Sequence, residues 1–198
     1  VKKNFKEALK WYRKAADQGN AVAQNNLGWM YSNGEGVRKN SKVALKWYRK
    51  ATDQGHAGAQ CSLGWMYSNG EGVRKNFKEA LKWYRKAADQ GYAGALGSLG
   101  WMYSNGEGVR KNSKVALKWY RKAADQGDVD ALHNLGLMYS NGEGVRKNFK
   151  EALKWYRKGA AQGHAGAQSD LGFIYSNGEG VKKNFKEALK WYRKAADQ

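Results

Sequence analysis

LGWMYSNGEGVRKN runs from Leu27 to Asn40, and the same letters recur without a change at Leu63–Asn76 and at Leu99–Asn112. Each copy begins 36 positions after the one before, and a Trp-Tyr pair keeps the same interval from Trp11 to Trp191. A period of this size is typical of a stacked array of short supersecondary units. The sequence therefore predicts a repeat protein with one unit every 36 residues.

Two helices and two glycine-marked breaks fill one unit. The first, helix A, is expected from Ala21 to Asn33, where apolar residues recur at the spacing of one helical face. It should end at Gly34, because glycine adopts the left-handed conformation that closes a helix. The second, helix B, is expected to begin after Asn40, whose side chain can accept a bond from a free backbone N–H. Because no stretch shows a strand pattern, the predicted fold class is all-α.

The repeat pattern predicts a single domain over residues 1–198. Residues 1–19 form helix B of a partial repeat, and the A/B pairs follow at 20–55, 56–91, 92–127, 128–163 and 164–198. One pair buries too little apolar surface to offset its own ordering, so contacts between neighbouring units must add to the stability. Neither terminal helix looks like a polar cap, so we expect apolar surface at both ends, either through truncation of a longer array or through self-association of these uncapped helices.

Composition narrows the function classes. The mean hydropathy is −0.87, and no apolar run approaches the roughly 20 residues that span a bilayer. The single cysteine, Cys61, excludes an intramolecular disulfide and a multi-cysteine metal site. The net charge of +19, from 36 basic and 17 acidic residues, raises the question of a polyanionic partner.

Within each unit the chain follows the pattern A-x-A-x-x-x-L-G-x-x-Y-x-x-G-x-G-V, then an N-capping residue, then A-x-x-W-Y-x-x-A-A-x-x-G. This pattern resembles Sel1-like repeats, which are relatives of tetratricopeptide repeats, over essentially the whole chain. The resemblance implies a right-handed α-α solenoid superhelix whose A helices line a concave groove and whose B helices form the outside. It also implies an adaptor or scaffold role, frequent in bacteria. Some members are exported, but these residues contain no signal-peptide pattern, so localisation stays undecided.

The candidate binding residues lie on the A helices, at positions of one helical face that differ between otherwise identical units and at the constant asparagine beside that face. They are Trp29, Asn33, Trp65, Asn69, Trp101, Asn105, His133, Leu137 and Phe173. Aromatic rings offer large contact area at low entropic cost, and amides hydrogen-bond peptide backbone, so a peptide or protein segment is the predicted ligand. Two alternatives stay open: the aromatic residues fill gaps between adjacent A helices, and the asparagines only end their helices.

Basic residues, in contrast, are the same in every B helix. Those on one exposed stripe of the first two B helices are Lys6, Lys10, Arg13, Lys42, Lys46 and Arg49. The alternative function is therefore binding of a polyanion, such as nucleic acid, acidic glycan or anionic membrane, by the convex B-helix face. We favour a solvated outer face, because a convex surface lacks a groove and the variable aromatic residues lie elsewhere.

Catalysis, a metal and a cofactor are not predicted. His133 is expected to make a local polar contact with Asp130 one turn earlier, and no nucleophile accompanies the two. His56 and His164 stand at the start of helix A, where a weak cap or a solvent-facing side chain is expected. Cys61 has no basic neighbour on its own face, so an unreactive thiol is expected. The sequence thus predicts a non-enzymatic interaction scaffold.

Overall fold

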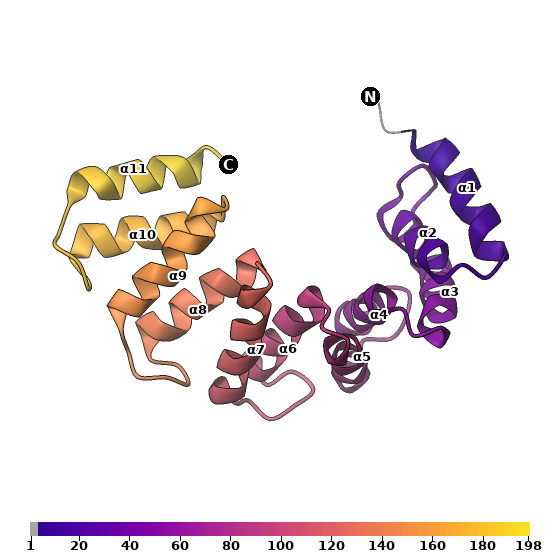
Figure 1. Cartoon of the computed structure of the whole chain (residues 1–198), viewed down its shortest axis with the longest axis horizontal. Coiled ribbons are helices and arrows are strands. Elements are labelled where there is room, and N and C mark those ends of the chain that lie inside the picture. The colour runs from indigo at the N-terminus through magenta and orange to yellow at the C-terminus, as the bar shows by residue number, and fades with distance from the viewer. Residues whose placement is uncertain (1–3) are drawn as a thin grey trace. The chain divides into compact units, whose positions relative to one another are not determined.

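The computed structural model describes residues 4–198, which form eleven helices and no strand. The helices are α1 (Phe5–Asp17), α2 (Ala21–Asn33), α3 (Ser41–Asp53), α4 (Ala57–Asn69), α5 (Phe77–Asp89), α6 (Ala93–Asn105), α7 (Ser113–Asp125), α8 (Val129–Asn141), α9 (Phe149–Ala161), α10 (Ala165–Asn177) and α11 (Phe185–Ala196). Even-numbered helices are the A helices and odd-numbered helices are the B helices (Figure 1). The predicted all-α repeat fold is confirmed.

Local capping chemistry sets the helix boundaries. Helix α2 ends at Asn33, and Gly34 follows it in the left-handed conformation with φ of 79°. The side chain of Asn40 accepts a bond of 3.1 Å from the backbone N–H of Val43 at the start of α3. The same asparagine cap occurs at Asn4, Asn76, Asn112, Asn148 and Asn184. The A- and B-helix boundaries expected from the sequence are therefore confirmed.

The two helices of a repeat touch through a glycine and a tyrosine. The ring of Tyr48 on α3 lies directly on Gly28 of α2, where an added Cβ would come within 2.6 Å of ring carbons. Both residues are buried, together with Leu27 and Met30. The contact recurs at Gly64 with Tyr84, Gly100 with Tyr120, Gly136 with Tyr156 and Gly172 with Tyr192. Part of the letter-for-letter repetition therefore encodes one close backbone–ring contact.

Adjacent repeats are joined by a side-chain bond and by a backbone approach. The guanidinium of Arg13 on α1 donates to the Tyr31 hydroxyl on α2, and Arg157 donates to Tyr175 at 2.6 Å in the same way. In the loop after α2, a Cβ on Gly36 would lie 2.6 Å from the backbone carbonyl oxygen of Phe5. The loop backbone of one repeat thus rests directly on the first turn of the preceding B helix.

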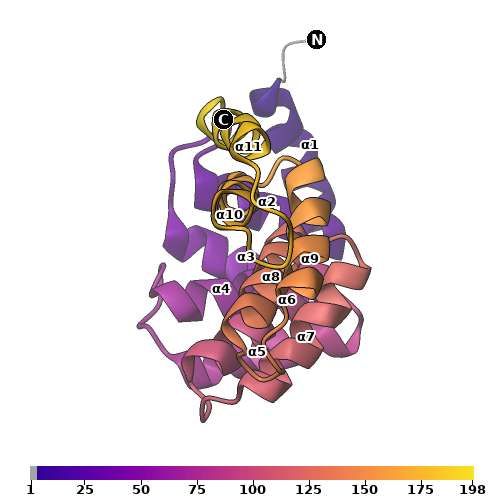
Figure 2. The same cartoon turned by 90° about the vertical axis from the view of Figure 1, so that its left-hand side faces the viewer.

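On a larger scale than the repeat, the chain divides into two compact units, which we call the first unit and the second unit. The first takes the chain to Ala95 and includes Glu107–Val109, and the second holds Leu96–Gly106 and Arg110–Gln198. In the second unit, α10 and α11 lie side by side in both views (Figures 1 and 2). That residues 1–198 form a single domain stays a prediction.

Helix α11 exposes apolar residues that the preceding B helix buries. Leu189 is 51% exposed, whereas Leu153, its counterpart on α9, is 6% exposed because α10 covers it. Phe185 and Tyr192 on α11 are exposed as well. Self-association through such ends stays a prediction.

Candidate protein-binding face of the A helices

In the first unit, two tryptophans point away from the core. Trp29 on α2 and Trp65 on α4 keep 47% and 46% of their surface exposed. Their sequence neighbours Gly28 and Met30 are buried, so the ring is on the helix face opposite the core contact. These indoles are not sealed between layers, although whether they contact a partner stays a prediction.

In the second unit, the same position holds Trp101, Leu137 and Phe173. Trp101 is 44% exposed and Phe173 is 52% exposed, whereas Leu137 is half-buried. The A-helix face of each unit therefore carries accessible apolar residues at the repeat interval. We use the name A-helix face for the positions of Trp29, Trp65, Trp101, Leu137 and Phe173, together with the neighbouring positions of Asn26 and His133.

The candidate asparagines serve their own helices. The side-chain amide of Asn33 donates to the backbone carbonyl of Trp29 at 3.0 Å, and Asn69 donates to that of Trp65 at 3.0 Å. Asn105 donates to Trp101 in the same way at 2.9 Å. These bonds lie within the last turn of each helix, which supports the helix-ending alternative. A role in binding stays a prediction for these residues.

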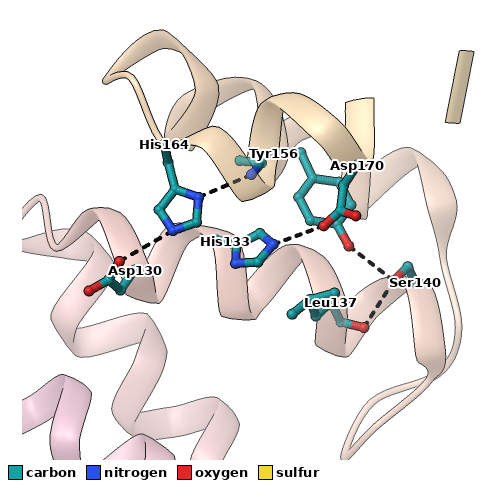
Figure 3. Close-up of polar contacts among 8 residues, drawn as sticks. Asp130, His133, Leu137, Ser140, Tyr156, His164 and Asp170 are labelled. Atoms are coloured by element: carbon teal, nitrogen blue, oxygen red, sulfur yellow. Dashed lines mark hydrogen bonds and ion pairs between the residues drawn. The ribbon is translucent and has the colours of Figure 1, made fainter. Parts of the chain in front are cut away.

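His133 pairs across repeats and not along its own helix. Its Nε2 lies 2.8 Å from Oδ2 of Asp170 on α10 (Figure 3), while Asp130 pairs with Nε2 of His164 at 3.2 Å. The expected contact between His133 and Asp130 is therefore wrong. The physical reason is that stacking brings α10 alongside α8, so a side chain on the next A helix is nearer than one on the same helix.

The histidines at the helix starts act as caps. Nδ1 of His164 accepts a bond of 3.0 Å from the backbone N–H of Ala167, and His56 caps α4 in the same way at 3.1 Å through Ala59. The expectation of a weak cap is confirmed for both. Because Nδ1 of His164 is an acceptor, its Nε2 is the nitrogen that donates to Asp130. The ring of His164 also lies against that of His133, with centroids 4.4 Å apart.

A cavity of about 250 Å³ opens beside this cluster, among α8, α9 and α10. Its lining includes Leu137 and Ser140 from α8, Phe149 and Tyr156 from α9, and Asp170 and Phe173 from α10. Lys147 and Glu179 from the adjoining loops complete the rim. We call this the acidic cavity.

Burial raises the pKa of the Tyr156 hydroxyl, and the nearby Asp170 carboxylate adds to the rise. Sequence reasoning missed Asp170 and Glu179 as site residues.

A second cavity, of about 190 Å³, lies at the same place in the repeat, between α1 and α2. It is lined by Phe5, Ala8, Tyr12, Asn26, Trp29 and Met30. We call this the apolar cavity, because it has no charged lining residue. Asn26 stands where Asp170 stands in the acidic cavity, and Trp29 stands where Phe173 stands.

The basic residues of the B helices are exposed but partly engaged. Lys6, Lys10, Lys42 and Lys46 are exposed, as expected. Arg13 and Arg49, however, donate to the hydroxyls of Tyr31 and Tyr67 on the next A helix. Other lysines cover tryptophan rings, as Lys50 does over Trp47 at 4.6 Å. Polyanion binding by this face stays a prediction.

Cys61 lies half-buried on α4. Burial raises the pKa of its thiol to about 12, so almost none is thiolate at neutral pH, in line with the unreactive thiol expected from the sequence. Among residues 4–198, no group of three or more His, Cys, Asp or Glu side chains is placed to hold a metal ion. Within the same residues, no helix has the length and hydrophobicity that a membrane span requires.

Comparison with known families supports the reading of the repeats. The family model described as Sel1 repeat matches residues 1–20, 21–56, 57–92, 94–128, 129–164 and 165–198. The chain belongs to the Sel1 repeat family. Sel1 repeat proteins generally mediate protein–protein interactions, and the family is typically non-catalytic. No curated protein sequence matches the chain.

Solved Sel1 repeat structures share the fold. A Sel1 repeat protein from Oxalobacter formigenes is 42% identical with a TM-score of 0.91, and the match covers 98% of this chain and 78% of that one. A protective antigen present in uropathogenic Escherichia coli strains is 40% identical with a TM-score of 0.85. That match covers all of this chain and 42% of the antigen, so this chain spans less than half of that relative. An immunity protein from Pseudomonas aeruginosa is 27% identical with a TM-score of 0.66, over 96% of this chain and 72% of that one.

Proposed function

We propose that this Sel1 repeat protein is a non-enzymatic scaffold that binds a peptide or protein segment along the A-helix face of each unit. The single observation that carries the proposal is the exposure of Trp29, Trp65 and Trp101, which keep 44–47% of their surface although both flanking positions on each helix are buried. Large aromatic residues contribute much of the binding energy at protein interfaces, and accessible ones that recur at a regular interval offer such contacts in successive repeats.

The chemistry of the surroundings favours a polypeptide over a polyanion. The A-helix face of the first unit offers aromatic rings with neutral polar neighbours such as Asn26 and Ser62, and no cation that would hold phosphate. The cations stand on the B helices, where Arg13 and Arg49 already bond tyrosines of the next repeat. A peptide can bury its apolar side chains on the indoles while its backbone bonds the polar neighbours.

The test is partner capture by variants of the A-helix face. Trp65→Ala and Trp101→Ala, alone and together, should reduce capture from bacterial and host lysates, and the double variant should abolish it, while helicity by circular dichroism stays close to that of the parent. Trp11→Ala is the matched control, because Trp11 is 56% exposed but lies on a B helix. Its capture should equal that of the parent.

Two results would contradict the proposal. One is capture by the double variant at the parent level, which would place the binding surface elsewhere. The other is loss of all capture at about 0.5 M salt, since a multi-phosphate contact collapses there and an aromatic one does not. Loss of helicity in Trp65→Ala would show that this ring belongs to the core.

A further inference from the structure

We propose that the acidic cavity binds a basic side chain, arginine or lysine, of the polypeptide that occupies the A-helix face. The inference rests on the proposed function, because it names the chemistry that one point of this face selects. It concerns only the second unit, which contains all residues of the cavity.

The size of the cavity suits one side chain. Its volume of about 250 Å³ lies below the roughly 300–1,000 Å³ of pockets that take whole small-molecule ligands. Its lining includes Phe173, a residue of the A-helix face that is 52% exposed. A segment lying along α10 can therefore place a single side chain in the cavity without entering it with its backbone.

The charge of the lining favours a cation. Asp170 and Glu179 contribute two carboxylates, and Lys147 contributes one ammonium group. Most remaining polar atoms, including the side-chain oxygens of Asn141 and Ser140, can accept a hydrogen bond. The carboxylate of Asp170 is specific to this repeat, because the equivalent positions hold Asn26, Ser62, Ser98 and Asn134. Stacking therefore does not require an acid at this position.

The aromatic walls suit the same cation. Phe149, Tyr156 and Phe173 line the space, and a cation gains energy over the face of an accessible ring. Because Tyr156 is buried against Gly136, Phe149 and Phe173 are the rings that can offer such a face. The cavity rim already shows this geometry, since the Lys147 ammonium nitrogen lies 4.6 Å from the centre of the Phe149 ring. A guanidinium can pair with a carboxylate at its edge and stack on a ring with its face at the same time.

Asp170 is held in place before any ligand arrives. Its Oδ2 lies 2.8 Å from His133 Nε2, and the His133 ring rests on His164, which is fixed as the cap of α10. The Asp170 side chain is nevertheless 33% exposed, so it stays accessible to a ligand. An oriented carboxylate lowers the entropic cost of pairing with a cation.

The experiment uses blocked tripeptides and the full chain. Ac-Ala-Arg-Ala-NH₂ and Ac-Ala-Lys-Ala-NH₂ are titrated by NMR, with the ring signals of His133 and Phe173 as readouts. Ac-Ala-citrulline-Ala-NH₂ is the neutral isostere of the arginine peptide. The basic peptides should shift both rings with saturation, and citrulline should bind at least about tenfold more weakly, which corresponds to ~1.4 kcal/mol.

Variants locate the site. Asp170→Asn should lower the affinity for the basic peptides at least about tenfold and should fold, because asparagine occupies the equivalent position in two other repeats. Glu179→Gln provides a second removal of charge that leaves the His133 pair intact. Asp125→Asn, an exposed acid of the same unit that does not line the cavity, is the matched control and should bind like the parent.

The inference is overturned if citrulline binds as well as arginine, if Asp170→Asn and Glu179→Gln both keep the parent affinity, or if no basic peptide binds up to about 10 mM. These outcomes differ from failure of the proposed function. Undiminished partner capture by the Trp65/Trp101 double variant would overturn that function while leaving peptide binding at the cavity intact.

Discussion

The apolar cavity between α1 and α2 and the acidic cavity among α8, α9 and α10 share a position in the repeat but not a chemistry. Phe5 and Tyr12 of the first correspond to Phe149 and Tyr156 of the second, and these residues are the same in both. One difference lies on the A helix, where Asn26 and Trp29 of the first correspond to Asp170 and Phe173 of the second, and another is that only the acidic cavity includes residues of a preceding A helix and of the loops, among them Glu179. Stacking thus fixes the B-helix wall, and the A-helix wall is where one repeat acquires a different ligand preference.

The polar groups around equivalent tyrosines also differ between the two units. Tyr48 and Tyr156 are equivalent and buried, and burial raises the pKa of both hydroxyls, that of Tyr48 to about 12. Tyr48 bonds Ser62, whereas Tyr156 bonds Ser140 and lies beside Asp170. A constant tyrosine therefore meets a neutral group in the first unit and a carboxylate in the second.

The largest expected effect comes from overpacking the contact that holds Tyr156, a residue of the shared B-helix wall. Gly136→Ala places a Cβ 2.4 Å from ring carbons of Tyr156, which is only 2% exposed. We expect the free energy of unfolding to fall by about 1–3 kcal/mol, as overpacked cores do, and the basic peptides to lose affinity because Tyr156 lines the acidic cavity. Chemical denaturation and the NMR titration measure the two effects.

Gly172→Ala is the matched control for that change. The added Cβ meets Tyr192 in the same geometry, but Tyr192 is 40% exposed and can move toward solvent. The helix-propensity gain of alanine over glycine, about 0.5–1 kcal/mol, should then leave stability unchanged or slightly raised. Equal destabilisation by both substitutions would show that the enclosure of Tyr156 is not what makes Gly136 necessary.

A smaller effect separates the two histidine–carboxylate pairs. Double-mutant cycles on His133 with Asp170 should give a coupling of about 0.5–1 kcal/mol, because both side chains are partly buried. The His164 pair should give no measurable coupling, since the Asp130 side chain is 87% exposed. Couplings of equal size, or a larger value for His164, would remove the argument that Asp170 is held by His133.

The smallest expected effect is the transfer of the acidic pair to the first unit. Asn25 and Ser62 correspond to His133 and Asp170, and Oδ1 of Asn25 is buried without a hydrogen-bond partner. In the double variant Asn25→His/Ser62→Asp, the introduced groups should couple by a few tenths of a kcal/mol, roughly the lower range for partly exposed pairs. The two single variants complete the double-mutant cycle from which this coupling is obtained.

Transfer should also bring a weak preference of the first unit for the arginine peptide over the citrulline peptide. The ring signals of Trp65 report it by NMR. If the double variant couples but shows no such preference, the acidic cavity depends on a feature that the first unit lacks, such as the ring of Phe149, whose counterpart is Ser41, because Glu71 already stands where Glu179 stands.

Local signals in the sequence were sufficient to predict where the helices begin and end. Gly34 and Asn40 predict a helix end and a helix start because each acts within its own few residues, and both boundaries are confirmed. The period of 36 likewise predicts the order of A and B helices. These features depend on backbone conformation and on contacts that every repeat makes in the same way.

Contacts between repeats were harder to predict. His133 was expected to pair with Asp130 because the two share a helix, but its partner is Asp170, which only the stacking of α10 beside α8 brings near. The bonds of Arg13 and Arg49 to tyrosines of the next A helix were missed for the same reason. The one available signal for the acidic cavity was that Asp170 is the only acid among five equivalent positions.

The loop glycines bring the backbones of neighbouring repeats into direct contact. Because the backbone at Gly36 rests on the Phe5 carbonyl, and that at Gly72 on the Ser41 carbonyl, no flexible side chain cushions one repeat against the next. If the A-helix face binds a segment as proposed, these backbone contacts set the spacing that the ligand must match, and a ligand with the right side chains at the wrong separation should bind more weakly.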